Sequence, residues 1–215
     1  MIKKKLLNYF KNWFDNFSLR KFFLNWFDYF RPNIFVSNLS QINVDWLVGN
    51  RIRLVIIDLD NTLVPFFAKR PTSYALKFIR KLKSKNMIVI VASNNRKKRV
   101  VNFCRDVNDI DDYIWLANKP FSWKIRNLLK KYHIVSEQTV IIGDQFITDI
   151  WTANILGTKS ILVTSLFDLP VNQITKKNSF KYWIENYIYW YLQKKNIVNE
   201  NDLSKIIIGT NDEIF

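Results

Sequence analysis

Apolar runs without polar alternation recur along the middle of the chain, and segments with helical periodicity separate them. The runs are residues 54–57, 87–92, 113–116, 139–142 and 160–164. Such runs are typical of strands that a parallel sheet buries on both faces. The segments with helical spacing are residues 71–85, 97–105, 122–132 and 148–156. This alternation predicts an α/β fold, a doubly wound parallel sheet of five strands.

The predicted α/β domain spans residues 32–175, with residues 1–31 before it and residues 176–215 after it. Inside the domain, residues 33–50 have neither a clear strand nor a clear helix pattern. We expect an irregular connector there, with a short helix near residues 44–48.

Both flanking segments carry apolar residues at helical spacing. The first predicts two short amphipathic helices that break near residues 16–18, and the second predicts one helix from Phe180 to Tyr191, followed by an acidic tail. Lysines surround the aromatic residues of both segments, among them Trp13, Trp26, Trp183 and Trp190. This composition suits helices in a membrane interface, and it also suits arms that pack on the domain or on a second subunit.

Several classes of protein are excluded by what the sequence lacks. No apolar run reaches the roughly 18 residues of a membrane-spanning helix. Lys11 and Asp15 interrupt the apolar core that a signal peptide requires. The single Cys104 cannot build a disulfide framework or a zinc cluster, and the lone His133 cannot build a histidine metal site. A reducing cytosol fits this composition.

The chain is strongly basic, with 33 Lys and Arg residues against 18 Asp and Glu residues and a formal net charge of +15. A charge of this size favours polyanionic partners, which include nucleic acid, anionic lipid and phosphorylated substrates. A general enrichment in Lys and Asn explains the same charge without any partner.

Two carboxylates, Asp58 and Asp60, end the apolar run of residues 54–57. Open α/β sheets bind ligands beyond the carboxyl ends of their strands. In an extended segment, residues two apart point the same way, so these carboxylates can converge on one ligand. Because two close anions repel each other, a Mg²⁺ ion is the expected ligand. Thr62 follows in a turn at the end of the strand.

Polar residues also follow the other predicted strands of the sheet. They are Ser93 and Asn94 after the second strand, Lys119 beyond the third, and Asp144 and Asp149 after the fourth. Carboxylates can hold a divalent cation, a hydroxyl and backbone amides can hold phosphate oxygens, and a lysine can neutralise the remaining negative charge. One Asp can then act as a nucleophile and a second as the acid and base. The pattern indicates phosphoryl transfer.

These motifs resemble those of the haloacid-dehalogenase (HAD) superfamily of phosphatases. The resemblance rests on Asp58-Leu59-Asp60-Asn61-Thr62, Ser93-Asn94-Asn95, Lys119-Pro120, and Gly143-Asp144 followed by Asp149. It covers roughly residues 30–192. Within the superfamily, these motif residues most resemble those of the YqeG group of subfamily IIIA. That group is similar to a mitochondrial phosphatidylglycerophosphatase. The resemblance implies a HAD-like Rossmannoid fold.

The resemblance also implies a role for each matching residue. Asp58 is expected to be the nucleophile and Asp60 the general acid and base. Mg²⁺ is expected to bind Asp58, the backbone carbonyl of Asp60, and Asp144.

The remaining matched residues are expected to contact the phosphate or to orient the groups that contact the metal and the phosphate. Ser93 and Asn94 are expected to bind phosphate, and Lys119 to neutralise it. Asp149 is expected to orient metal-bound water or Lys119, and Thr62 to lie behind the reacting groups.

The spacing of the motifs leaves no room for a lid domain. The chain between Asp60 and Ser93 can hold one loop and one helix, and the chain between Asn95 and Lys119 can hold one helix and one strand. We therefore expect a capless domain with an open site. An open site suits a phosphate group that is carried by a membrane, a protein or a nucleic-acid end.

The expected function is Mg²⁺-dependent hydrolysis of a phosphomonoester through an aspartyl-phosphate intermediate. The expected substrate is phosphatidylglycerophosphate, converted to phosphatidylglycerol at the inner face of the membrane by a cytoplasmic, peripherally bound enzyme. The partners are then a phosphorylated lipid headgroup and, through the terminal segments, an anionic membrane surface. The alternatives are a nucleic-acid-end or phosphoprotein phosphatase, and a non-catalytic basic protein that binds RNA or ribosomes.

Overall fold

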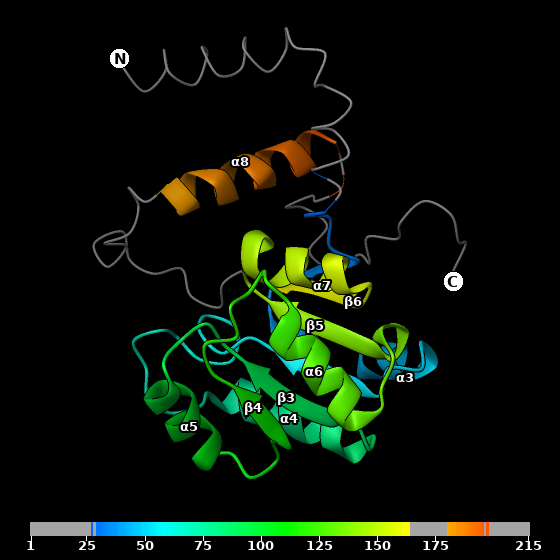
Figure 1. The fold of residues 1–215 in the computed structure, drawn as a ribbon, viewed down its shortest axis with the longest axis vertical. Helices are drawn as coiled ribbons and strands as arrows, with labels where there is room; N and C mark the ends of the chain where they lie inside the picture. Colours follow the sequence, from blue (N-terminus) through cyan, green and yellow to red (C-terminus); the bar gives the residue numbers. More distant parts are fainter. Residues whose placement is uncertain (1–26, 28, 164–179, 196, 198–215) are drawn as a thin grey trace, which may run out of the picture.

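The computed structural model describes residues 27, 29–163, 180–195 and 197 (Figure 1). The predicted N-terminal helices, with Trp13 and Trp26, and most of the acidic tail lie outside these residues.

All six strands of the single sheet run parallel, in the order β1-β6-β5-β2-β3-β4. The strands are β1 (Ile34–Val36), β2 (Leu54–Ile57), β3 (Ile88–Ala92), β4 (Asp112–Ile114), β5 (Thr139–Gly143) and β6 (Lys159–Val163). The α-helices are α3 (Val44–Gly49), α4 (Ser73–Ser84), α5 (Lys97–Arg105), α6 (Trp123–Tyr132), α7 (Trp151–Leu156) and α8 (Phe180–Lys194). Short η1 (Leu39–Gln41), η2 (Ser136–Gln138) and the π-helical η3 (Phe146–Ile150) complete the described elements.

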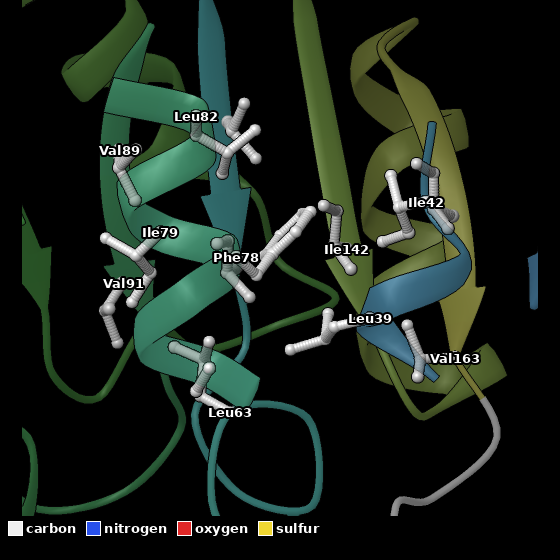
Figure 2. Close-up of a cluster of buried hydrophobic side chains, with 14 of the residues drawn as sticks. Leu39, Ile42, Leu63, Phe78, Ile79, Leu82, Val89, Val91, Ile142 and Val163 are labelled. Carbon is white, nitrogen blue, oxygen red and sulfur yellow. The ribbon is translucent and has the colours of Figure 1, made fainter. Parts of the chain in front are cut away.

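The central strand β2 is buried on both faces, which confirms the prediction from its unbroken apolar sequence. Val55 and Ile57 face a core shared with α3, α4 and α5, whereas Leu54 and Ile56 face a core shared with α6 and α7. Figure 2 shows part of the first core, in which Phe78 and Ile79 of α4 pack toward the sheet. Helices on both faces of a parallel sheet make the predicted doubly wound fold.

The sheet has one strand more than the five predicted, because the supposed connector contains β1. Its register pairs Ile34 with Ile161 of β6. The Asn33 side chain accepts a hydrogen bond from the backbone N–H of Ser160 at 2.8 Å and so fixes that register. Three apolar residues after a proline carry too little local signal to identify a strand. Their strand conformation depends on a partner more than 120 residues away.

Two predicted boundaries also shift. β4 ends at Ile114 rather than at Leu116, which has a φ of 45° and cannot continue a strand. The helix expected from Thr148 begins two residues earlier as the π-helical η3. The chain between Asp60 and Ser93 holds only α4 and β3, and the chain between Asn95 and Lys119 holds only α5 and β4. The domain is therefore capless, as predicted.

The C-terminal segment forms α8, a helix as expected, and α8 packs on the domain itself. Ile188 and Leu192 are buried in a cluster with Phe30, Phe146 and residues of β1 and β6. In Figure 1, α8 lies next to α7 and β6 at one end of the domain. Of the two alternatives for this segment, its apolar stripe therefore supports packing on its own domain. No helix in the described part of the chain is both long and apolar enough to cross a bilayer.

Candidate active site

A buried ion-pair network lies where β2, β3 and β5 end. The Lys119 ammonium lies 2.6 Å from an oxygen of Asp58 and 2.6 Å from an oxygen of Asp149, and it also donates to the Ala92 carbonyl at 2.8 Å. The Lys119 side chain is only 2% exposed. A lysine buried this deeply is stable only when it is paired, and here all three ammonium hydrogens have acceptors. The network therefore joins residues from three predicted motifs.

Electrostatics in this network favour a bound cation. Burial raises the pKa of Asp58 to about 7, although Lys119 acts in the opposite direction. Burial, followed by the charges of Asp58 and Asp149, raises the pKa of Asp144 well above its usual range. Although burial alone lowers it, the pKa of Lys119 rises because Asp149 and Asp58 surround it. Three carboxylates against one ammonium leave excess negative charge.

The donor set of this cluster fits a divalent metal. Carboxylate oxygens of Asp58, Asp144 and Asp149 lie within 4.8 Å of one another. Among the described residues, Oδ1 of Asp144 is buried without a hydrogen-bond partner. Such an atom is costly unless something binds it. Both oxygens of Asp149 already have protein partners, in Lys119 and in the backbone N–H of Gln145. Asp58 and Asp144 are therefore the side chains best placed to bind a hard cation.

Gly143 is the position that allows Asp149 to enter the network. A Cβ atom at Gly143 would lie 2.2 Å from Cγ of Asp149, a distance that no pair of non-bonded carbons tolerates. The hydroxyl of Thr148 and the backbone N–H of Gln145 hold the other oxygen of Asp149. The glycine therefore serves close packing between β5 and η3, since this position needs no unusual backbone angle.

Glu185 of α8 fixes the loop that carries Asp144 and Asp149. Its carboxylate accepts hydrogen bonds from the backbone N–H groups of Phe146 at 2.9 Å and Ile147 at 3.0 Å. These N–H groups open η3 and have no acceptor within the helix. Charge-assisted hydrogen bonds of this kind are stronger than neutral ones. The C-terminal helix thus holds the loop of Asp144 and Asp149 in place.

Asn94 connects the second and third motifs. Its side-chain oxygen accepts from the backbone N–H of Lys119 at 2.8 Å, and its amide donates to the Lys119 carbonyl at 3.0 Å. Ser93 is buried, and its hydroxyl accepts from the backbone N–H of Asn95 at 3.1 Å. Both residues lie beside the network, with the Asn94 side chain occupied in positioning Lys119.

Asp60 is held apart from the acidic cluster. Its carboxylate accepts from Arg99 Nη2 at 2.9 Å and from the Asn95 amide at 3.1 Å. Arg99 also donates to the carbonyls of Pro65, at 3.1 Å, and Ala68. Arg99 therefore ties Asp60 to the loop that follows it.

The turn after Asp60 places Thr62 in the interior. Asn61 has a φ of 65°, and its N–H donates to the Val64 carbonyl at 2.7 Å. Thr62 is fully buried, and among the described residues its hydroxyl has no hydrogen-bond partner.

Comparison with known proteins identifies the family. The chain is 31% identical over 132 residues, which are 61% of this chain and 76% of the relative, to "Probable phosphatase YqeG" of Bacillus subtilis (strain 168). Residues 116–167 match the family model described as HAD-hydrolase-like. The chain belongs to the HAD phosphatases. HAD phosphatases use a divalent metal, for which this chain has the acidic cluster described above.

Two solved HAD phosphatase structures are similar to this one at lower sequence identity. One is 3-deoxy-D-manno-octulosonate 8-phosphate phosphatase from Yersinia pestis, at 16% identity and a TM-score of 0.46, covering 71% of this chain and 86% of that one. The other is the cobalt-bound deoxy-D-mannose-octulosonate 8-phosphate phosphatase from Haemophilus influenzae, at 18% identity and a TM-score of 0.44, covering 69% and 91%.

Sequence reasoning missed two residues of this HAD phosphatase site, Arg99 and Glu185, and the packing role of Gly143. Arg99 lies in the run Arg96-Lys97-Lys98-Arg99, which has the pattern of a solvated helix face. Glu185 lies 38 residues beyond Ile147 in a segment with no motif. Gly143 was part of a motif, but nothing local indicates that Asp149 packs against it. Only the tertiary fold brings these residues to the site.

Proposed function

We propose that this HAD phosphatase is a Mg²⁺-dependent phosphomonoesterase that forms an aspartyl phosphate on Asp58. The observation that carries the proposal is the buried network, in which the unpartnered Asp144 oxygen lies near a carboxylate that is neutralised by a single lysine. Asp58, Asp144 and the Asp60 backbone carbonyl would hold the ion. When bound, Mg²⁺ supplies positive charge against the phosphoryl oxygens.

The chemistry divides hydrolysis into two displacements. An oxygen of Asp58 attacks phosphorus, the bond from phosphorus to the ester oxygen breaks, and Asp60 gives its proton to the departing alkoxide. Water then attacks the acyl phosphate, Asp60 takes a proton from that water, and inorganic phosphate leaves with Asp58 regenerated. Lys119 offsets negative charge throughout, and the Ser93 hydroxyl and the loop beginning at Asn94 bind the phosphate oxygens.

This role requires the Asp60 carboxyl to become available to the ester oxygen. Its oxygens accept hydrogen bonds from Arg99 and from the Asn95 amide. Contact with the ester oxygen would compete with these hydrogen bonds, so substrate binding has to supply compensating interactions. Apo structures commonly show catalytic groups before they tighten on the substrate.

We further propose phosphatidylglycerophosphate as the substrate, hydrolysed at a membrane surface. Two observations support a large, externally presented substrate. No domain is inserted in the loops after β2 and β3, and the chain carries a net charge of +15. A capless site excludes water only when the carrier of the phosphate covers it. An anionic bilayer is such a carrier, and a basic protein is attracted to it.

The decisive experiment measures phosphate release from three substrates side by side. They are phosphatidylglycerophosphate in anionic vesicles, an oligonucleotide with a terminal phosphate, and a phosphopeptide. We expect the lipid to have the highest kcat/KM and all turnover to stop when the metal is chelated. A higher kcat/KM for the oligonucleotide or the peptide would replace the lipid as substrate, and turnover that survives chelation would remove the metal-dependent mechanism.

A further inference from the structure

Exposed apolar side chains gather at the edge of the sheet that carries the candidate active site. The described residues include eleven large apolar side chains that are exposed, and six of them lie at the carboxyl edge of the sheet. These six, called the apolar rim below, are Phe66, Phe67, Tyr74, Leu116, Phe121 and Trp123. Phe121 is 74% exposed, Phe67 56% and Trp123 54%. Isolated exposed apolar residues are ordinary, but a concentration at one site marks an interaction surface.

The loops that carry the rim are joined to one another and to the catalytic network. Arg99 at the start of α5 donates to the Pro65 carbonyl, next to Phe66. The N–H of Leu116 donates to the Asn95 carbonyl at 3.0 Å. Phe121 lies two residues after Lys119, whose ammonium contacts Asp58. The rim therefore lies on the edge of the sheet that carries Asp58.

Basic side chains accompany the rim. The exposed basic residues of the same loops and of the first turn of α5 are Lys69, Arg70, Arg96, Lys97 and Lys98. Asp60, which lies on the same edge of the sheet, is paired with Arg99. A surface of aromatic rings among cations matches the interfacial layer of an anionic membrane, where rings enter below the headgroups and lysines remain among the phosphates.

The geometry of the rings favours a membrane over nucleic acid. Bases stack on open, flat aromatic faces. Here Lys124 lies over the ring of Trp123 at 5.4 Å. Phe66 and Phe67 meet at 84°, so the pair presents ring edges and no continuous platform. Such edges gain mainly from transfer out of water.

We propose that the apolar rim is a membrane-docking surface, which inserts into the headgroup region of an anionic bilayer and brings the catalytic opening onto the lipid. This inference rests on the proposed phosphatase function and assigns its membrane contact to the active-site face. The proposal does not use α8, whose apolar stripe packs within the domain. A docked rim also closes the capless site against bulk water.

The test measures binding of the full chain to phosphatidylcholine vesicles with and without added phosphatidylserine. No phosphate monoester is present, so the result does not depend on catalysis. The variants are F66S/F67S in one loop and F121S/W123S in the other. Val135→Ser is the matched control, since Val135 is 56% exposed in the loop that leads into β5, away from the apolar rim. Circular dichroism and thermal melting check that each variant folds.

We expect each double variant to bind anionic vesicles at least about tenfold more weakly, because it lacks two rings that enter the bilayer on docking. Binding of the control should be unchanged. Lys98→Gln should weaken binding by about fivefold, and only when phosphatidylserine is present. Unchanged vesicle binding in both double variants would overturn the proposal. So would loss of affinity for a single-stranded RNA in the rim variants while vesicle binding persists. Rim-dependent vesicle binding without any phosphatase activity would keep the docking surface and reject the proposed catalysis.

Discussion

Asp58 and Asp60 are two residues apart in the chain but lie in different surroundings. Asp58 is in the buried network with Lys119, where burial raises its pKa to about 7. Asp60 is in a partly exposed pair with Arg99, in which both side chains remain nearly one-fifth accessible. Their difference follows from where β2 ends. The strand stops at Ile57, and the turn at Asn61 redirects the chain, so the alternation of a strand no longer governs these side chains.

The comparison indicates a division of labour. The Asp58 region is rigid and preorganised, because every partner of Lys119 is buried and fixed. The Asp60 region lies on the loop that carries Phe66 and Phe67, where substrate contact can release Asp60 from Arg99. The proposed function therefore assigns charge binding to the Asp58 region and proton transfer to Asp60.

The strongest test removes the nucleophile. Asp58→Asn should lower turnover of an aryl phosphate by about 10⁴-fold or more, because a carboxamide forms no acyl phosphate. The substitution removes a buried charge, so the protein should fold and melt at least as high as the wild type. Phosphate release and thermal melting measure the two effects. Asp45→Asn is the control, since Asp45 pairs with Lys85 on the surface. Activity within tenfold of the wild type would exclude a covalent Asp58 intermediate.

The second test concerns Asp60 as the proposed proton donor. Asp60→Asn should lower turnover of an alkyl phosphate by about 10²–10⁴-fold, because its alkoxide leaving group needs a proton. The loss should be much smaller for 4-nitrophenyl phosphate, whose leaving group departs without one. The measurement is the ratio of kcat values on the two substrates. Asp112→Asn, which removes a surface pair with Lys131, serves as the control. Equal losses on both substrates would assign Asp60 to structure only.

A smaller effect is expected from changing Glu185, which holds the loop of Asp144 and Asp149. Glu185→Gln should weaken Mg²⁺ binding by about tenfold, because residues that orient metal ligands typically have effects of this size. The Mg²⁺ concentration that gives half of the thermal stabilisation measures this without relying on activity. Glu137→Gln, in the exposed η2, is the control. A lower melting temperature with unchanged Mg²⁺ affinity would show that Glu185 supports the fold and not the metal site.

The last test concerns pH and the metal-free protein. The pKa of Asp58 is 3.8 in the unfolded chain and about 7 in the folded one. The folded state therefore holds a proton that the unfolded state releases, and this contribution to stability is full below pH 3.8 and is lost as the pH rises toward 7. Urea unfolding in a chelator should show this loss in the wild type, and Asp58→Asn should reduce it. Parallel pH profiles for the two proteins would contradict the pKa shift.

Local sequence was sufficient to predict the parallel sheet and the position of the catalytic edge. Unbroken apolar strands followed by Asp58, Lys119 and Asp144 require no tertiary information, since parallel strands bring their carboxyl ends to one edge. The motifs predicted that Asp58 and Asp144 would meet, but local sequence could not indicate the partners of Asp60. Whether Asp60 pairs with Arg99 depends on how α5 packs, and β1 depends on pairing with β6.

The contact between Glu185 and η3 also sets an order during synthesis of the protein. Residues 34–163, which form the whole sheet, leave the ribosome before Glu185 does. Until Glu185 emerges, the N–H groups of Phe146 and Ile147 lack their acceptor, and the loop bearing Asp144 is not held. The growing chain can therefore complete all six strands before α8 is available to hold this loop.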